Sequence, residues 1–234
     1  MKEYFKKHWN SIKADAVDKF PNESCGMIVD DKYVSCVNIA EDPAKHFKIS
    51  DETYIYYSNT GKIDAIVHSH NDFIHLSLPD MEGQLKTSVP WGMVNVKNRN
   101  AQSIVFWGDQ LEPQDLIGRP FCHGVYDCYS LMRDYFREKS IIIDVFPREW
   151  EWWNKGQNLY VEKLKDSAFA DIDKKELQDG DIILFQMQST VPNHCGVYIG
   201  DGLMMHHLPN RLSKREPANI WIKKYATHFL RYNG

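Results

Sequence analysis

The sequence predicts an α+β fold divided into two domains, residues 1–108 and 109–234. Three observations lead to this expectation. The 234 residues are enough to build two modest hydrophobic cores. Side chains with catalytic or metal-binding character fall into two separate halves of the chain. Between these halves lies a polar stretch, Gly108 to Pro113, which contains turn residues and offers little that could pack.

Composition excludes several classes of protein. A net charge of -4 gives no basic surface for a nucleic acid. No apolar run reaches the roughly 20 residues of a membrane-spanning helix, and the N-terminal residues lack the apolar centre of a signal peptide. We therefore expect a chain that folds in the cytoplasm, spans no membrane and binds no nucleic acid. Five cysteines at irregular spacing indicate reduced thiols rather than a disulfide framework.

The first half is predicted to contain helices and strands in alternation. Apolar residues from Tyr4 to Phe20 recur at helical spacing among lysines and acids. An Asp30-Asp31 turn indicates a hairpin, and Ser50 is a good N-cap for a second helix. The expected helices cover residues 3–19 and 50–59, and the expected strands cover 23–29, 32–37, 63–68, 91–96 and 103–107.

A possible zinc site follows the strand that ends at His68. Residues two apart on a strand face the same side, so His68 and His70 can reach one ion, and Asp80 can close the set. Two imidazoles and one carboxylate leave a fourth position for water, as in catalytic zinc sites. Glu23 would then be the general base and Ser77 an oxyanion donor. The alternative is a polar strand end followed by a helix cap, and the spacing alone leaves both open.

In the second half, Cys128 is the candidate nucleophile. It follows a turn-forming Gly124 and opens an amphipathic pattern that predicts a helix to about Lys139. The first-turn N–H groups of a helix favour a thiolate, which is the reactive form of cysteine. The other four cysteines are better explained as small buried hydrophobes.

Two histidines can complete the cysteine site. His194 begins an apolar strand, and a Gly-Asp-Gly turn returns the chain so that His206 follows twelve residues later. A cysteine needs a base, and the base needs a group that orients its ring, so we assign these roles to His194 and His206. His207 is adjacent to His206, and on a strand only one of the two can face His194.

The rest of this half is predicted to form an antiparallel sheet that packs on the cysteine helix. The aromatic stretch 145–157 is irregular and is better explained by core packing than by a substrate groove. A helix is expected over 158–165, and strands are expected after Gly180, from His194, up to His206, near 220–222 and near 229–231.

The motif of the second half resembles that of the NlpC-type family of papain-like cell-wall peptidases. The resemblance covers about residues 115–232 and rests on Asp127-Cys128, His194-x-Gly196 and His206. It implies a papain-like domain that cleaves peptide or isopeptide bonds in peptidoglycan stems, and it favours His206 over His207. Many members have Asp-Cys-Ser, where this chain has Asp-Cys-Tyr-Ser.

The first half resembles the JAMM (MPN) metalloprotease family through Glu23, the His-Ser-His motif ending at His70, and Ser77-x-x-Asp80. This resemblance implies a deaminase-like α/β/α fold and a zinc ion held by the two histidines and Asp80. Glu23 would be the base, and Ser77 would assist at the oxyanion. The family usually has seven residues between the second histidine and the serine, whereas this chain has six, residues 71–76.

Over its full length, the chain resembles the tail assembly protein K family of lambda-like siphophages, in which these two domains are fused. The stretches that carry this resemblance include Gly118 to Ser130 and Met205 to Ser213. The resemblance implies a hydrolase that assembles with other tail tip proteins in the virion and digests peptidoglycan locally, in the periplasm, during genome delivery. The alternative is a structural tail tip component whose two hydrolase sites are relics.

Overall fold

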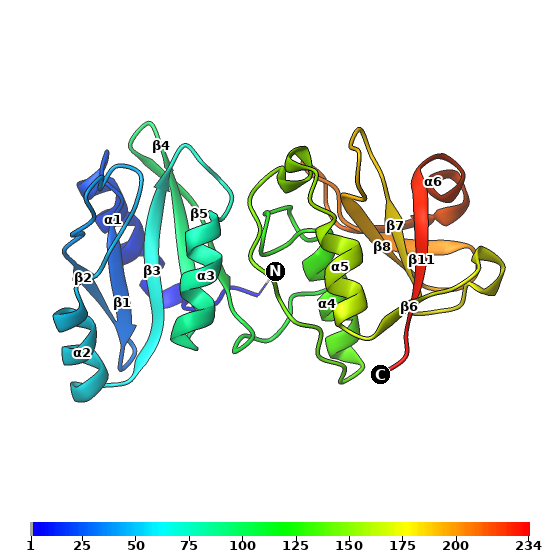
Figure 1. The fold of residues 1–234 in the computed structure, drawn as a ribbon. Helices are drawn as coiled ribbons and strands as arrows, with labels where there is room; N and C mark the ends of the chain where they lie inside the picture. The colour runs from blue at the N-terminus through cyan, green and yellow to red at the C-terminus, as the bar shows by residue number, and fades with distance from the viewer. Residues whose placement is uncertain (1) are drawn as a thin grey trace. The chain divides into compact units, whose positions relative to one another are not determined.

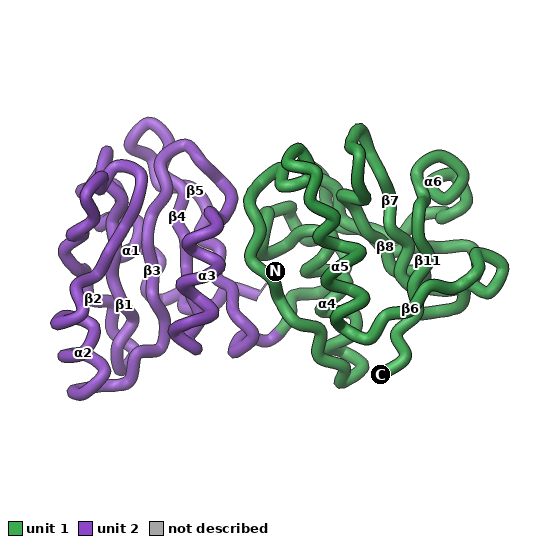
Figure 2. The backbone as a smooth tube through the Cα atoms, viewed as in Figure 1, with its two compact units in different colours: residues 1, 113–234 green, residues 2–112 purple. Residues whose placement is uncertain are grey.

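The computed structural model describes residues 2–234, which form two compact units, residues 2–112 and residues 113–234 (Figures 1 and 2). The division falls after Glu112, inside the polar stretch 108–113. All five cysteines are buried free thiols. Within residues 2–234, no helix has both the length and the hydropathy to cross a membrane.

The N-terminal unit is built on a five-stranded mixed sheet in the order β2-β1-β3-β4-β5. Only the β3–β4 pair is parallel within the described chain, and helix α3 makes the connection between these two strands. The strands are β1 Cys25–Val29, β2 Lys32–Cys36, β3 Ile63–Asn71, β4 Trp91–Lys97 and β5 Asn100–Trp107. The helices are η1 Lys6–His8, α1 Trp9–Lys19, α2 Asp51–Thr60 and α3 Leu78–Thr87.

Helix α1 covers one face of this sheet. Its buried Ile12 and Ala16 pack in one cluster with Ala65 and Val67 of β3. Since neighbouring residues on a strand alternate between faces, His68 lies on the opposite face of β3 from Val67. The two predicted histidine ligands, His68 and His70, therefore lie on the face of β3 that α1 does not cover.

Local signals account for the ends of several elements. Asp30 and Asp31 both have positive φ, 45° and 61°, as the tight turn between β1 and β2 requires. The Ser50 hydroxyl accepts a hydrogen bond from the Thr53 amide and caps α2. The first predicted helix is divided into η1 and α1.

The C-terminal unit contains a six-stranded antiparallel sheet in the order β10-β9-β8-β7-β11-β6. The strands are β6 Phe169–Asp171, β7 Ile182–Phe185, β8 His194–Tyr198, β9 Leu203–His206, β10 Lys214–Pro217 and β11 Ala226–Tyr232. The helices are α4 Cys128–Glu138, η2 Trp152–Lys155, α5 Leu159–Asp166, η3 Lys174–Glu176 and α6 Ala218–Tyr225.

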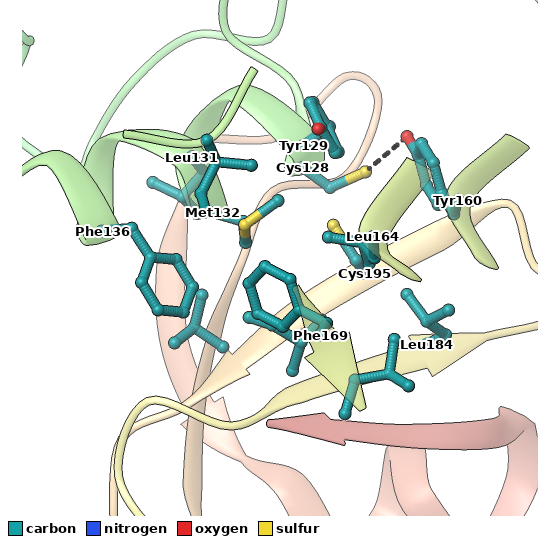
Figure 3. Packing of buried hydrophobic residues seen from close by; sticks show 14 of the residues in the cluster. Cys128, Tyr129, Leu131, Met132, Phe136, Tyr160, Leu164, Phe169, Leu184 and Cys195 are labelled. Atoms are coloured by element: carbon teal, nitrogen blue, oxygen red, sulfur yellow. Dashed lines mark hydrogen bonds between the residues drawn. The ribbon is translucent and has the colours of Figure 1, made fainter. Parts of the chain in front are cut away.

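Helix α4 packs on the centre of this sheet. Leu131 and Met132 contribute to a large buried cluster that includes Leu184 of β7 and Cys195 of β8 (Figure 3). Because α4 contacts β8 and β9, the cysteine at its start lies beside the two strands that carry the predicted histidines. The sheet thus positions both partners of the nucleophile.

One predicted element is wrong. Residues 220–222, expected as a strand, belong to helix α6. Trp221, Ile222 and Tyr225 recur at helical spacing and pack on a second cluster around Phe185 and Met204. Packing of this apolar helix face outweighs the strand preference of the Ile-Trp-Ile triplet.

Candidate functional site

The predicted nucleophile is the first residue of α4. Asp127 is the N-cap of this helix and accepts a hydrogen bond from the Ser130 amide at 2.9 Å. Cys128 is buried, and its Sγ lies 3.3 Å from the Tyr160 hydroxyl of α5 (Figure 3). The helix therefore holds the thiol at its N-terminal end, with one hydroxyl directed at the sulfur.

The surroundings of Cys128 favour its ionised form. Burial opposes ionisation, but hydrogen bonds from Cys195 and His194, together with the charge of His194, hold the pKa of the thiol well below its usual range. Burial and the nearby Cys128 raise the pKa of Tyr160, so the hydroxyl keeps its proton and can donate it to the sulfur. A thiolate at a helix N-terminus is the reactive state that cysteine catalysis needs.

A chain of hydrogen bonds leads away from the sulfur. Nε2 of His194 lies 3.0 Å from Nδ1 of His206, and Nε2 of His206 contacts Oε1 of Glu216. A carboxylate only accepts, so His206 carries its proton on Nε2 and offers a bare Nδ1. His194 then donates from Nε2, which leaves its Nδ1 lone pair for the Cys128 proton. Glu216 thus sets the tautomer of both rings.

The charge state of His206 agrees with this arrangement. Burial, followed by the neighbouring His194, lowers its pKa to about 4, so the ring is neutral at neutral pH. The adjacent His207 lies just beyond the end of β9, and its Nε2 bonds the Arg211 carbonyl at 3.1 Å. Of the two candidates left open by the sequence, His206 is therefore the one beside His194.

A cavity of about 200 Å³ opens beside Cys128 and His194. Aromatic side chains form much of its wall, and these are Phe121, Trp150, Trp152, Trp153 and Tyr160. The aromatic stretch 145–157 thus serves two purposes, since Trp152 also belongs to the buried core. From the sequence, core packing was the favoured explanation of this stretch, ahead of a substrate groove.

Three contributors to this site were not predicted. Tyr160 lies in an expected helix, but nothing in its local sequence links it to Cys128. Glu216 reaches the site because β10 pairs with β9, a strand that was not anticipated. Arg148 comes from the irregular aromatic stretch and forms a buried ion pair with Asp127.

The N-terminal unit brings His68, His70 and Asp80 together. Nε2 of His68 lies 3.1 Å from Nε2 of His70, and the Asp80 oxygens lie 3.2 Å and 3.1 Å from these two nitrogens. Neighbouring ligands around tetrahedral zinc, bound at about 2.0–2.1 Å, are about 3.3 Å apart. The three buried ligand atoms are therefore spaced as one zinc ion would require.

The helix cap and the predicted ligand set share residues. The alternative interpretation had Asp80 as the cap, but Ser77 is the N-cap of α3, and Asp80 completes the capping box from the third helical position. The Ser77 hydroxyl also donates to Asp80 Oδ2 at 2.6 Å, which fixes the orientation of the carboxylate toward the histidines. Capping and ligand positioning therefore use the same hydrogen bonds.

Glu23 lies with His70, Ser77 and Asp80 on the wall of a cavity of about 890 Å³. Burial raises the pKa of Glu23 to about 7, with His70 opposing the shift. A carboxyl group with this pKa can both take and return a proton near neutral pH. All five residues predicted for this site therefore lie close together in the N-terminal unit.

Comparison with known proteins agrees with this architecture. Residues 118–231 match the NlpC/P60 family. The chain is 37% identical to tail tip assembly protein K of Escherichia phage lambda, over 78% of this chain and 87% of that protein. It is 29% identical to tail tip assembly protein K of Escherichia phage N15, over 95% of this chain and 93% of that protein.

Among solved structures, NlpC2 from Trichomonas vaginalis is similar at 17% identity and a TM-score of 0.38. The similarity covers 58% of this chain and 56% of that one. The match to the lambda protein extends over most of both chains, and the NlpC/P60 match covers the unit that contains Cys128. The chain therefore belongs to the tail tip assembly protein K family, and its C-terminal half is an NlpC/P60 domain of the cysteine-peptidase type.

Proposed function

We propose that this chain takes part in assembly of a phage tail tip and that its C-terminal half cleaves peptidoglycan stem peptides during genome delivery. The observation that carries the enzymatic part is the unbroken chain from Cys128 through His194 and His206 to Glu216. A relic site would have no reason to keep these four groups in hydrogen-bonding order. The printed names of the phage relatives support the assembly part.

The chemistry follows from the tautomers. The Cys128 thiolate attacks the carbonyl carbon of the scissile amide, and the protonated His194 gives its Nδ1 proton to the leaving amine. His206 accepts the Nε2–H of His194 throughout and holds the cationic ring in place. A water molecule, deprotonated by His194, then releases the acyl group from the sulfur.

The test is digestion of purified peptidoglycan by the full-length chain, followed by mass analysis of the released fragments. We expect new peptide termini with the wild-type chain and none with Cys128→Ala. Glu23→Gln is the matched control, because it changes a buried group of the other unit and should leave this cleavage intact. Loss of cleavage in Glu23→Gln but not in Cys128→Ala would reverse the roles of the two halves.

For the N-terminal half we propose a zinc-dependent peptidase site. His68, His70 and Asp80 would hold the metal, and Ser77 would keep Asp80 oriented. A zinc ion bound there would act as a Lewis acid toward an amide carbonyl. Glu23 would accept and return a proton at its carboxylate, and the Ser77 hydroxyl could also donate to the substrate oxygen.

Metal content decides this second proposal. We expect about one equivalent of zinc in protein purified without chelators, and a large loss in His70→Ala. His46→Ala is the matched control, because His46 lines the same cavity but is exposed and outside the ligand set. Equal zinc in both variants, or none in the wild type after zinc is added, would exclude the site.

The location follows from these two proposals. The chain would fold in the host cytoplasm, join other tail tip proteins there and reach the periplasm inside the virion. Its substrate would then be the peptidoglycan of the next host. Recovery of the chain from purified virions, with antibodies against either half, tests this location.

A further inference from the structure

A second cavity of the C-terminal unit, of about 360 Å³, adjoins the cavity beside Cys128. Trp153 and Gln188 line both cavities, so the two share a border. The remaining residues on the wall of the second cavity are Asn154, Ser189 and Thr190. Its lining side chains are all uncharged, and apart from the indole each carries an amide or a hydroxyl group. We call this second cavity the side groove.

One wall of the side groove is an indole ring whose orientation is fixed by its neighbours. Trp153 belongs to η2 and contacts the rings of Trp150 and Trp152 nearly at right angles, with centroids 5.8 Å and 5.7 Å away. Trp152 is buried in the core, whereas Trp153 is only half-buried. Part of the Trp153 ring is therefore left to contact a ligand.

The other wall is the loop between β7 and β8, which is held in shape by its own hydrogen bonds. Oδ1 of Asn193 accepts from the Met187 amide at 2.9 Å, and its Nδ2 donates to the Met187 carbonyl at 3.0 Å. The Ser189 hydroxyl donates to a carbonyl of the same loop at 2.8 Å. The side chains of Gln188 and Thr190 stand outside these bonds and are exposed. The loop thus presents an amide and a hydroxyl on a preformed backbone.

An indole face beside neutral amide and hydroxyl groups has the chemistry that recognises a sugar. The C–H groups of a pyranose ring pack on an aromatic face, and its hydroxyls both donate and accept hydrogen bonds. An acetamido group adds one donor and one acceptor, which the side-chain amides of Gln188 and Asn154 can match. A stem peptide carries carboxylates, and the lining residues of the side groove within the described chain include no cation to pair with them.

We propose that the side groove is a saccharide subsite, which holds an N-acetylated sugar of the glycan strand while Cys128 acts on the attached stem peptide. This inference rests on the proposed peptidoglycan activity and adds a binding site to it. The first stem residue is attached directly to the sugar. Because the two cavities share a border, one substrate molecule can therefore occupy both.

The first test is binding of tetra-N-acetylchitotetraose, a neutral sugar probe without a stem peptide. We expect saturable binding to the full-length chain, with a shift of the Trp153 indole resonance in NMR spectra. Binding should be about tenfold weaker in the double variant Asn154→Ala with Thr190→Ala, since each lost hydrogen bond weakens binding by roughly two- to tenfold. Both side chains are exposed, so the fold should survive, which circular dichroism checks.

The matched control is Gln157→Ala, an exposed position that does not line the side groove. It should bind the probe as the wild type does. No binding by the wild type, or equal binding by a folded double variant, would overturn the subsite. Equally tight binding of maltotetraose, which has no acetamido groups, would overturn its assignment to the glycan of peptidoglycan.

Kinetics connect the subsite to cleavage. The two substrates are the disaccharide tetrapeptide of peptidoglycan and the same tetrapeptide with an N-acetyl group in place of the sugars. We expect at least a tenfold higher kcat/KM for the disaccharide form, mainly through a lower KM, because contacts far from the reacting atoms stabilise the ground state and the transition state alike. This advantage should fall about tenfold in the double variant and persist in Gln157→Ala. Equal kcat/KM for the two substrates in the wild type would overturn the proposal.

Failure of the subsite and failure of the peptidoglycan activity give different results. Cleavage of peptidoglycan without binding of the chitotetraose would overturn the subsite and leave the activity in place. Binding of the sugar without cleavage of peptidoglycan or of either substrate would overturn the activity, and with it the role of the side groove in cleavage.

Discussion

The buried ion pair between Asp127 and Arg148 gives a quantitative test of the C-terminal unit. Replacing Asp127 by Asn keeps the shape of the side chain but removes its charge. We expect this change to lower the free energy of unfolding of the C-terminal unit by about 3–5 kcal/mol, the usual cost of leaving one partner of a buried pair uncompensated. The expected loss is large because both side chains are almost fully buried.

The contacts of Asp127 account for this magnitude. Each oxygen accepts two hydrogen bonds, from Ser130 on one side and from Gly124 and Arg148 on the other. In Asn one oxygen becomes an NH₂ group that faces donors, so two bonds to a charged group are lost at about 1.5–3 kcal/mol each. The free energy of unfolding of a domain of this size is about 5–15 kcal/mol, so the change removes roughly a fifth or more of it.

Urea unfolding monitored by tryptophan fluorescence can measure the loss, because four of the seven tryptophans lie in residues 113–234. The matched control is Asp166→Asn, the same change in an exposed pair with Lys163, which should cost less than about 0.5 kcal/mol. The double variant Asp127→Asn with Arg148→Met should recover part of the loss. A shift below about 1 kcal/mol for Asp127→Asn would refute the reasoning.

Further predictions concern the same site. In peptidoglycan digestion, Cys128→Ala should lower the rate of cleavage at least as much as His194→Ala, and both should lower it more than His206→Ala. The reason is that the covalent path survives the loss of an orienting group. Cleavage by Cys128→Ala at the wild-type rate would contradict this order. Glu216→Gln keeps an acceptor for His206, so activity should fall much less than in Glu216→Leu, and ¹⁵N NMR should show a mixture of His206 tautomers only in the Leu variant. Burial lowers the pKa of His206 from 6.5 to about 4, so between these pH values the ring is protonated in the unfolded chain and neutral in the folded chain. The free energy of unfolding should therefore fall as the pH drops from about 6.5 toward 4. His206→Gln should show a smaller loss over that range in urea titrations, and an unchanged loss would assign the acid sensitivity to other groups.

Features carried by a few neighbouring residues could be predicted from the sequence. Cys128 was identified because a turn at Gly124 and a helical pattern meet within a few positions. The period of a strand was enough to place His68 and His70 on one face of β3. The match to the NlpC/P60 family covers residues 118–231, which include Cys128, and the role of Cys128 as nucleophile stays a prediction. The zinc site stays a prediction.

Features that depend on distant register could not be predicted. Glu216 reaches His206 because β10 pairs with β9, where Lys214 stands opposite His206. Arg148 reaches Asp127 from a segment without regular structure, so no periodicity marks it. The triplet 220–222 has the composition of a strand, and only its packing on the second cluster shows why it is helical.

The buried carboxylates of the two halves have different charge partners, and this difference bears on which half would hold a metal. Asp127 has a guanidinium partner, so its charge is balanced within the fold. Among the described residues, the ion-pair partners of Asp80 are His68 and His70, and an imidazole is cationic only when protonated. Although burial opposes protonation, Asp80 raises the pKa of His70, so a proton on that ring can balance the carboxylate, and a divalent cation bound between the three groups could take the place of this proton. The same criterion gives no reason to expect a metal beside Cys128, where Arg148 already supplies the positive charge.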